Sequence, residues 1–220
     1  MKKKRKVTKN KERAADVIFL DELLKLQGET VVVGIIEITE DYEGKEIVIP
    51  FNLICNEIKL QNEEKYPKKV SIKGNLEVKG ETLNIGESDL EVTGHIIAEG
   101  EISTGNIIVE DSLISFGKIN CYDLKVGKNF HPKRGISSYN ISVKGYIDAK
   151  GDMDTYDIDT DGFFYLAEGD ADALNITVKG SLTVKDGEIA ASSIDVGDDF
   201  SFSGKVDCDY VKCKGKILHI

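Results

Sequence analysis

The sequence predicts an all-β protein, a triangular single-stranded β-solenoid with about 17–18 residues in each coil. Two observations carry this prediction: aliphatic residues recur at a fixed period, and glycines recur at fixed places between them. A fixed period of about 20 residues is typical of repeat proteins, in which each unit buries its apolar face against its neighbours. We therefore expect one elongated hydrophobic core.

The first strand of each coil is predicted by two apolar columns. The opening aliphatic residue of each coil lies one period after that of the coil before. These residues are Leu90, Ile107, Leu124, Ile141, Ile158, Ile176, Ile194 and Val211. A valine-rich column follows two positions later and contains Val92, Val109, Val126, Val143, Thr160, Val178, Val196 and Cys213. Side chains two positions apart point to the same side of a strand, so both columns are expected to face inward.

Two further pairs of columns predict a second and a third strand in every coil. The second pair contains Ile96, Leu113, Phe130, Ile147, Phe164, Leu182, Phe200 and Ile217, then Ala98, Ser115, Pro132, Ala149, Leu166, Val184, Phe202 and His219. The third contains Ile102, Ile119, Ile136, Met153, Ala171, Ile189 and Val206, then the small residues Thr104, Cys121, Ser138, Thr155, Ala173, Ala190 and Cys208. Three inward pairs per period predict a three-sided coil.

Turn residues separate the predicted strands. Glycines follow the first pair at 94, 145, 162, 180 and 215, and the second at 100, 117, 151 and 204. The third turn carries Asn106, Asp123, Asn140, Asp157 and Asn175, whose short side chains can bond turn backbone. Two earlier residues, Ile54 and Ile72, are expected to open irregular coils at the same step.

Three regions are expected along the chain. Residues 1–13 hold eight basic residues and one acid and are predicted to form a disordered basic tail. Residues 14–71 are predicted to cap the solenoid, with one amphipathic helix over 14–27 followed by strands. The solenoid itself is predicted over 72–220.

Composition excludes several classes of protein. No apolar stretch approaches the roughly 18 residues that a membrane helix needs, and no signal peptide is recognisable, so we expect a cytoplasmic protein. Cys208 and Cys213 lie close together in the sequence, while Cys55 and Cys121 lie far away. This spacing predicts neither a zinc site nor a disulfide framework, and no cofactor is expected.

The C-terminal coil is the predicted self-association surface. An uncovered last coil presents unpaired backbone groups around an apolar centre that includes Val211, Cys213 and Ile217. We expect residues 205–220 to pair with another copy, giving a two-fold dimer or, if the N-terminal cap moves aside, a filament. The basic tail is a candidate for binding an anionic surface or nucleic acid, and the alternative is a solubilising role.

A calcium-loop pattern lies in the most acidic stretch of the chain. Asp157, Asp159, Asp161 and Glu168, with Gly162, match the spacing of an EF-hand loop. Alternate residues of this segment belong to the inward columns and neither flank reads as a helix, so we expect an acidic strand and turn. Weak calcium binding at the four carboxylates is the alternative.

The acidic stretch from Asp148 to Asp172 holds nine acids and one lysine, and Asp148, Asp152 and Asp154 begin it. Such a face is either a solvated surface or a mimic of a nucleic-acid backbone that binds a protein partner.

Tyr122, Tyr139 and Tyr156 share one outward position in consecutive coils and predict a tyrosine ladder. The ladder could bind a partner or stack for stability alone.

Catalysis is not expected. The three histidines lie apart, at His95, His131 and His219, and the coils contain no long insertion that could build a pocket. The period is also similar to that of hexapeptide acyltransferases, but no small-molecule substrate is predicted.

The units I141-S-V-K-G-Y-I-D-A-K-G and I176-T-V-K-G-S-L-T-V-K-D-G resemble bactofilins, the polymer-forming bacterial cytoskeletal proteins. The resemblance covers about residues 72–220 and implies a right-handed triangular β-helix that assembles end to end without nucleotide. The expected function is therefore a non-enzymatic scaffold that self-associates through its ends. The alternative is an acidic decoy, inhibitor or adaptor, such as one of phage origin, that binds a nucleic-acid-handling enzyme.

Overall fold

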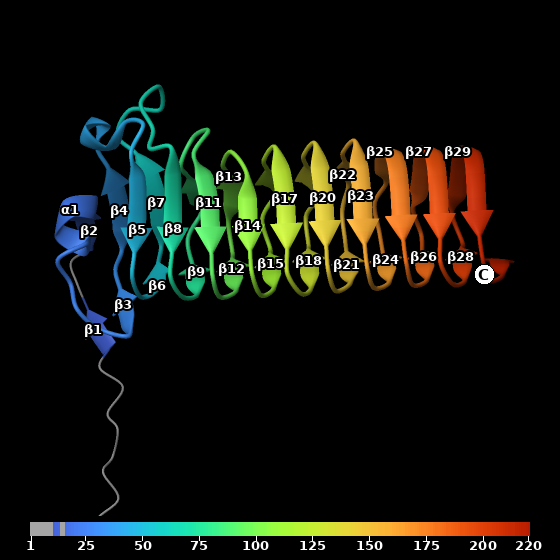
Figure 1. Ribbon diagram of the computed structural model, residues 1–220, viewed down its shortest axis with the longest axis horizontal. Helices are drawn as coiled ribbons and strands as arrows, with labels where there is room; N and C mark the ends of the chain where they lie inside the picture. Colours follow the sequence, from blue (N-terminus) through green and yellow to red (C-terminus); the bar gives the residue numbers. More distant parts are fainter. Residues whose placement is uncertain (1–10, 14–15) are drawn as a thin grey trace, which may run out of the picture.

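The computed structural model describes residues 11–13 and 16–220 and is a parallel β-solenoid of about 11 turns (Figure 1). The all-β solenoid expected from the sequence is confirmed, with about 18 residues per coil and almost no helix. Every strand pairing among the described residues is parallel, as the successive turns of one winding chain require.

Three ladders of strands run along the solenoid, and each coil passes through ladders A, B and C in that order. Ladder A contains β5 (Glu46–Ile49), β8 (Lys69–Ile72), β11 (Asp89–Val92), β14 (Ile107–Val109), β17 (Asp123–Val126), β20 (Asn140–Val143) and β23 (Asp157–Thr160). It ends with the second halves of β25 (Ala171–Val178), β27 (Glu188–Val196) and β29 (Lys205–Cys213).

Ladder B contains β1 (Lys11–Arg13), β3 (Thr30–Val32), β6 (Asn52–Cys55), β9 (Leu76–Val78), β12 (Ile96–Ala98), β15 (Leu113–Ser115), β18 (Phe130–Pro132), β21 (Ile147–Ala149), β24 (Phe164–Leu166), β26 (Leu182–Val184), β28 (Phe200–Phe202) and β30 (Ile217–His219). Ladder C contains β2 (Val17–Phe19), β4 (Ile35–Ile38), β7 (Glu57–Leu60), β10 (Thr82–Asn84), β13 (Glu101–Ser103), β16 (Ile119–Asn120), β19 (Ile136–Ser137), β22 (Met153–Asp154) and the first halves of β25, β27 and β29.

The apolar columns lie in register as predicted. Val126 pairs with Val143, and Thr160 links Val143 to Val178, so the valine column is continuous. These residues are at most 2% exposed, and the three valines form part of one core cluster. The expected position of Ala190 in the small third column is wrong: Ala173 pairs with Ala191, and Ala190 points outward.

The coils before Ile96 are longer than the repeat, because Val31 pairs with Leu53, Leu53 with Leu76 and Leu76 with Ile96. The two early opening positions are therefore wrong. Ile54 is an outward residue of ladder B, and Ile72 pairs with Val92 as the second inward residue of its strand. The step of the regular repeat does not fit these coils.

Ladders A, B and C run through residue 72 without a break, so the strands of 30–60 form coils in the same stack. The predicted tail covers residues 1–13; residues 1–10 lie outside the described part, whereas Lys11–Arg13 pair with Thr30–Val32 as a strand.

The helix expected over 14–27 is wrong for its described residues. Val17–Phe19 form β2, which pairs with Ile35–Glu37, and only Leu20–Leu23 form the helix α1. The β-branched and aromatic side chains of 17–19 gain more from the neighbouring strand than from a helical turn. Helix α1 takes the place that a strand of ladder A has in other coils. Its residues Leu20 and Leu23 are buried.

Glycines allow the coils to approach closely at the corner between ladders B and C. A Cβ atom on Gly187 would lie 2.0 Å from the carbonyl oxygen of Gly169 in the preceding coil. Gly151 has a φ of +89°, in the left-handed region that favours glycine. This close approach and this backbone conformation explain why glycine recurs at this turn.

At the corner between ladders C and A, Asp and Asn alternate from coil to coil. The side-chain amide of Asn106 donates to Asp89 at 2.8 Å, that of Asn140 to Asp123 at 2.7 Å, and that of Asn175 to Asp157 at 2.8 Å. The alternation places a neutral donor beside each carboxylate, which avoids charge repulsion between adjacent coils.

Candidate functional site

The C-terminal coil exposes one apolar position that is buried in every other coil of the regular repeat. Ile217 lies in the same column as Phe200 and Leu182, yet it is 55% exposed whereas they are at most 1% exposed. Strands β29 and β30 each pair with only one neighbour within the described part of the chain. Predicted interface residues Val211 and Cys213 are half-buried in β29.

The C-terminal coil therefore presents an apolar centre surrounded by a strand edge. Leu218 and Ile220 are also exposed beside Ile217. Figure 1 shows that this coil forms the end of the solenoid opposite α1. Such an edge can pair with another strand, since half of its backbone groups point away from the preceding coil.

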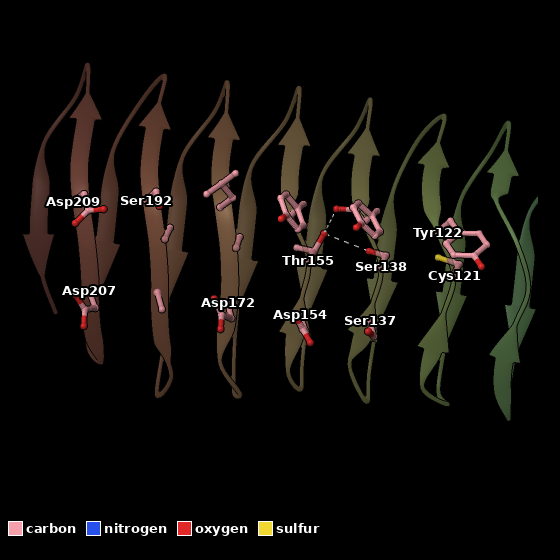
Figure 2. Close-up of a pocket in the computed structure, with 16 residues that line it drawn as sticks. Cys121, Tyr122, Ser137, Ser138, Asp154, Thr155, Asp172, Ser192, Asp207 and Asp209 are labelled. Carbon is pink, nitrogen blue, oxygen red and sulfur yellow. Dashed lines mark hydrogen bonds between the residues drawn. The ribbon is translucent and has the colours of Figure 1, made fainter.

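A groove runs along the outer corner between ladders C and A and has a volume of about 750 Å³. One wall is the predicted tyrosine position, which continues in later coils as Leu174, Ser192 and Asp209. Figure 2 shows the other wall as a row of outward side chains on successive strands, with Ser137, Asp154, Asp172 and Asp207 labelled. We call this feature the corner groove.

The tyrosine ladder is partly a stacked one. The rings of Tyr139 and Tyr156 are 5.1 Å apart and inclined by 8°, and Tyr122 lies at the same position one coil earlier. All three side chains are more than half exposed. Thr155, a small residue of the third column, bonds the backbone of the ladder: its hydroxyl donates to the carbonyl oxygen of Tyr139 at 2.9 Å. The ladder thus offers aromatic surface to solvent.

The calcium-loop residues do not form a loop. Asp157 and Asp159 lie in β23, Asp161 pairs with Lys179, and Glu168 pairs with Lys150 at 2.8 Å at a different corner. Among the described residues, no group of three or more His, Cys, Asp or Glu side chains is arranged to hold a metal ion. The weak calcium candidate is therefore not assembled.

The other acidic candidates separate into two environments. Asp148 accepts bonds from His131 and Lys133 at 3.2 Å each, and the Asp152 carboxylate accepts from the backbone N–H of Asp170 at 3.1 Å. Burial alone would raise the pKa of Asp148, but the bonds from Lys133 and His131 outweigh it and hold the pKa below its usual value. Asp154 is exposed in the corner groove.

The structure contains a second aromatic stack, which the sequence analysis did not predict. The rings of Tyr146 and Phe163 are 4.5 Å apart and inclined by 8°, and His131 meets Tyr146 edge-on at 5.3 Å. Both stacked residues precede the second inward pair of consecutive coils, so their spacing of one period carried the same signal as the tyrosines. His131 thus packs and pairs at the surface of ladder B.

Two cysteines have little thiolate at neutral pH. Burial raises the pKa of Cys55 to about 12, and burial followed by the charge of Asp123 raises the pKa of Cys121 to about 12. Because the thiolate is the reactive form, both side chains serve packing.

No protein-family model matches the chain, and no curated protein or solved structure matches it significantly. Within the described residues no helix has the length and apolar character to cross a membrane.

Proposed function

We propose that the protein is a non-enzymatic structural scaffold, similar to bactofilins, that self-associates through the C-terminal coil. The observation that carries the proposal is the exposure of Ile217, in a column whose preceding members are buried. Pairing with another copy would cover this apolar centre and bond the free strand edge.

The two ends differ in a way that favours a closed pair. Helix α1 replaces a ladder A strand in the first coil, and its residues Leu20 and Leu23 are buried. A second copy stacking on that end would meet strand edges on ladders B and C but a helix on ladder A. Contact between two C-terminal coils leaves α1 in place and closes by two-fold symmetry.

The acidic-decoy alternative has weaker support. Three of the nine carboxylates between 148 and 172 are paired with lysines of neighbouring coils: Asp148 with Lys133, Asp161 with Lys179 and Glu168 with Lys150. These pairs break the continuous negative charge that a mimic of nucleic acid needs.

Ile217→Lys tests the proposal in the full chain. A charge at the centre of the contact would be buried without a partner. In high salt, which screens contacts between exposed charges, the variant should therefore sediment as a monomer and the wild type as a dimer. Val48→Lys is the matched control, because Val48 is 50% exposed in β5 and lies far from the C-terminal coil. A wild-type chain that remains monomeric when concentrated would contradict the proposal.

A further inference from the structure

We propose that the corner groove binds the basic N-terminal segment 1–10 of another copy. The segment M-K-K-K-R-K-V-T-K-N carries six basic residues and no acid, whereas the whole chain has a net charge of −10. The groove combines exposed carboxylates with exposed aromatic rings, and both attract lysine and arginine.

The carboxylates of the groove are available to an incoming cation. Asp154, Asp172 and Asp209 are exposed and make no salt bridge with any described residue, and Asp207 approaches only Lys205, at 3.9 Å. By contrast, Lys179 and Lys212 already hold carboxylates on the adjoining face. A basic segment would therefore find its unpaired counter-charges along this groove.

The opposite wall supplies flat apolar surface for the same side chains. The stacked rings of Tyr139 and Tyr156 stand beside Tyr122 and Leu174 along the corner. A lysine stem can lie on such rings while its ammonium group reaches the aspartates across the groove. This arrangement favours an extended basic chain over a compact anion or a purely apolar ligand.

The length of the segment fits the groove. The positions from Tyr122 to Asp209 span six successive coils, or about 24 Å at about 4.8 Å per step. Ten extended residues reach about 33 Å, which is sufficient to cover it.

The geometry assigns the segment to another molecule. Residue 11 begins β1 in the first coil of ladder B, and the groove begins at β16, the sixth strand of ladder C. Crossing five coils takes about 24 Å, which uses most of the reach of ten residues. A chain's own segment would cover only the near end of its groove.

The test titrates a fluorescein-labelled peptide of residues 1–10 with the full-length protein and follows fluorescence anisotropy. We expect saturable binding that weakens as salt rises. The double variant Asp154→Asn/Asp172→Asn should raise the Kd about fivefold, the effect of losing two exposed ion pairs. Tyr139→Ser should also raise the Kd, although it leaves the charge unchanged.

Glu99→Gln/Glu110→Gln is the matched control, since it removes two exposed carboxylates outside the groove. It should leave the Kd within about twofold of the wild-type value. Equal weakening by both double variants would show that net charge alone attracts the peptide and would overturn the proposal, as would the absence of binding at low salt.

The Ile217→Lys chain separates this inference from the proposed scaffold function. It should bind the peptide as the wild type does, because the groove does not include Ile217. Loss of peptide binding in this variant would overturn the assignment to the corner groove and leave the C-terminal contact standing.

Discussion

The two ends of the solenoid differ in whether the apolar core is covered. At the N-terminal end, α1 packs against β2 and β4, and Leu23 is 0% exposed. At the C-terminal end, Ile217 is 55% exposed although it continues a column of buried residues. The difference teaches that a residue type does not determine burial in a solenoid; the next coil does.

The largest effect expected from this comparison concerns one column. Phe164→Ala removes a fully buried ring between Ile147 and Leu182 and should cost about 3–5 kcal/mol of unfolding free energy. Ile217→Ala in the same column should cost less than about 1 kcal/mol in the monomer, since the side chain is mostly exposed. Urea denaturation at a dilute protein concentration measures both. Equal losses would mean that the two positions share one environment.

A corner glycine gives the next effect. Gly187→Ala places a Cβ atom against the Gly169 carbonyl and should destabilise the fold by about 1–3 kcal/mol through overpacking. Gly44→Ala is the control in an N-terminal coil, where a Cβ atom would meet open space but φ is +66°. The Gly44→Ala variant should lose about 1 kcal/mol of unfolding free energy, from backbone strain alone. Thermal unfolding separates the two; a harmless Gly187→Ala would show that the coils can move apart.

The Asp–Asn ladder predicts a pH-dependent effect of about 1 kcal/mol. Asn140→Asp removes the bond to Asp123 and places three carboxylates on consecutive coils. The loss should be present at neutral pH and shrink in acid, because repulsion needs ionised carboxylates. Asn140→Ser, which adds no charge, should show no such recovery in acid. A pH-independent loss for Asn140→Asp would rule out charge repulsion as its cause.

The smallest effect belongs to the irregular coils. Bonds from Lys69 and Lys73 hold the pKa of Glu91 below its ordinary value of 4.5. A lowered folded pKa stabilises the protein above the unfolded pKa, and this stability is lost as pH falls through the folded pKa. Glu91→Gln should therefore be less stable than the wild type at pH 7, and the difference should shrink at an acidic pH below 4.5. Denaturation at both pH values checks this, and a constant difference would contradict it.

The regular coils could be predicted because their period is strict. Each inward residue from Leu90 onward has its equivalent one period away, and the register pairs those residues. Before Ile96 the coils lengthen, as the pairing of Leu53 with Leu76 shows, and a fixed step misplaces Ile54 and Ile72. The prediction of a helix over 14–27 was wrong for a related reason. Val17–Phe19 are extended because they pair with β4, which lies farther along the sequence.

Only part of the candidate site could be predicted from the sequence. The tyrosine ladder follows from spacing, and so does the exposed C-terminal column. The corner groove does not, because its acidic wall and aromatic wall come from different ladders and meet only when coils stack. Ala190 also interrupts the row of Asp154, Asp172 and Asp207, which hides the row in the sequence.

Hydrogen–deuterium exchange as a function of protein concentration tests the C-terminal contact most directly. We predict that amides of β29 and β30 exchange more slowly in concentrated than in dilute solution, while those of β2 and α1 are unchanged. Ile217→Lys should abolish the concentration dependence. Exchange in β29 and β30 that is independent of concentration, or protection that appears at α1 instead, would contradict the account.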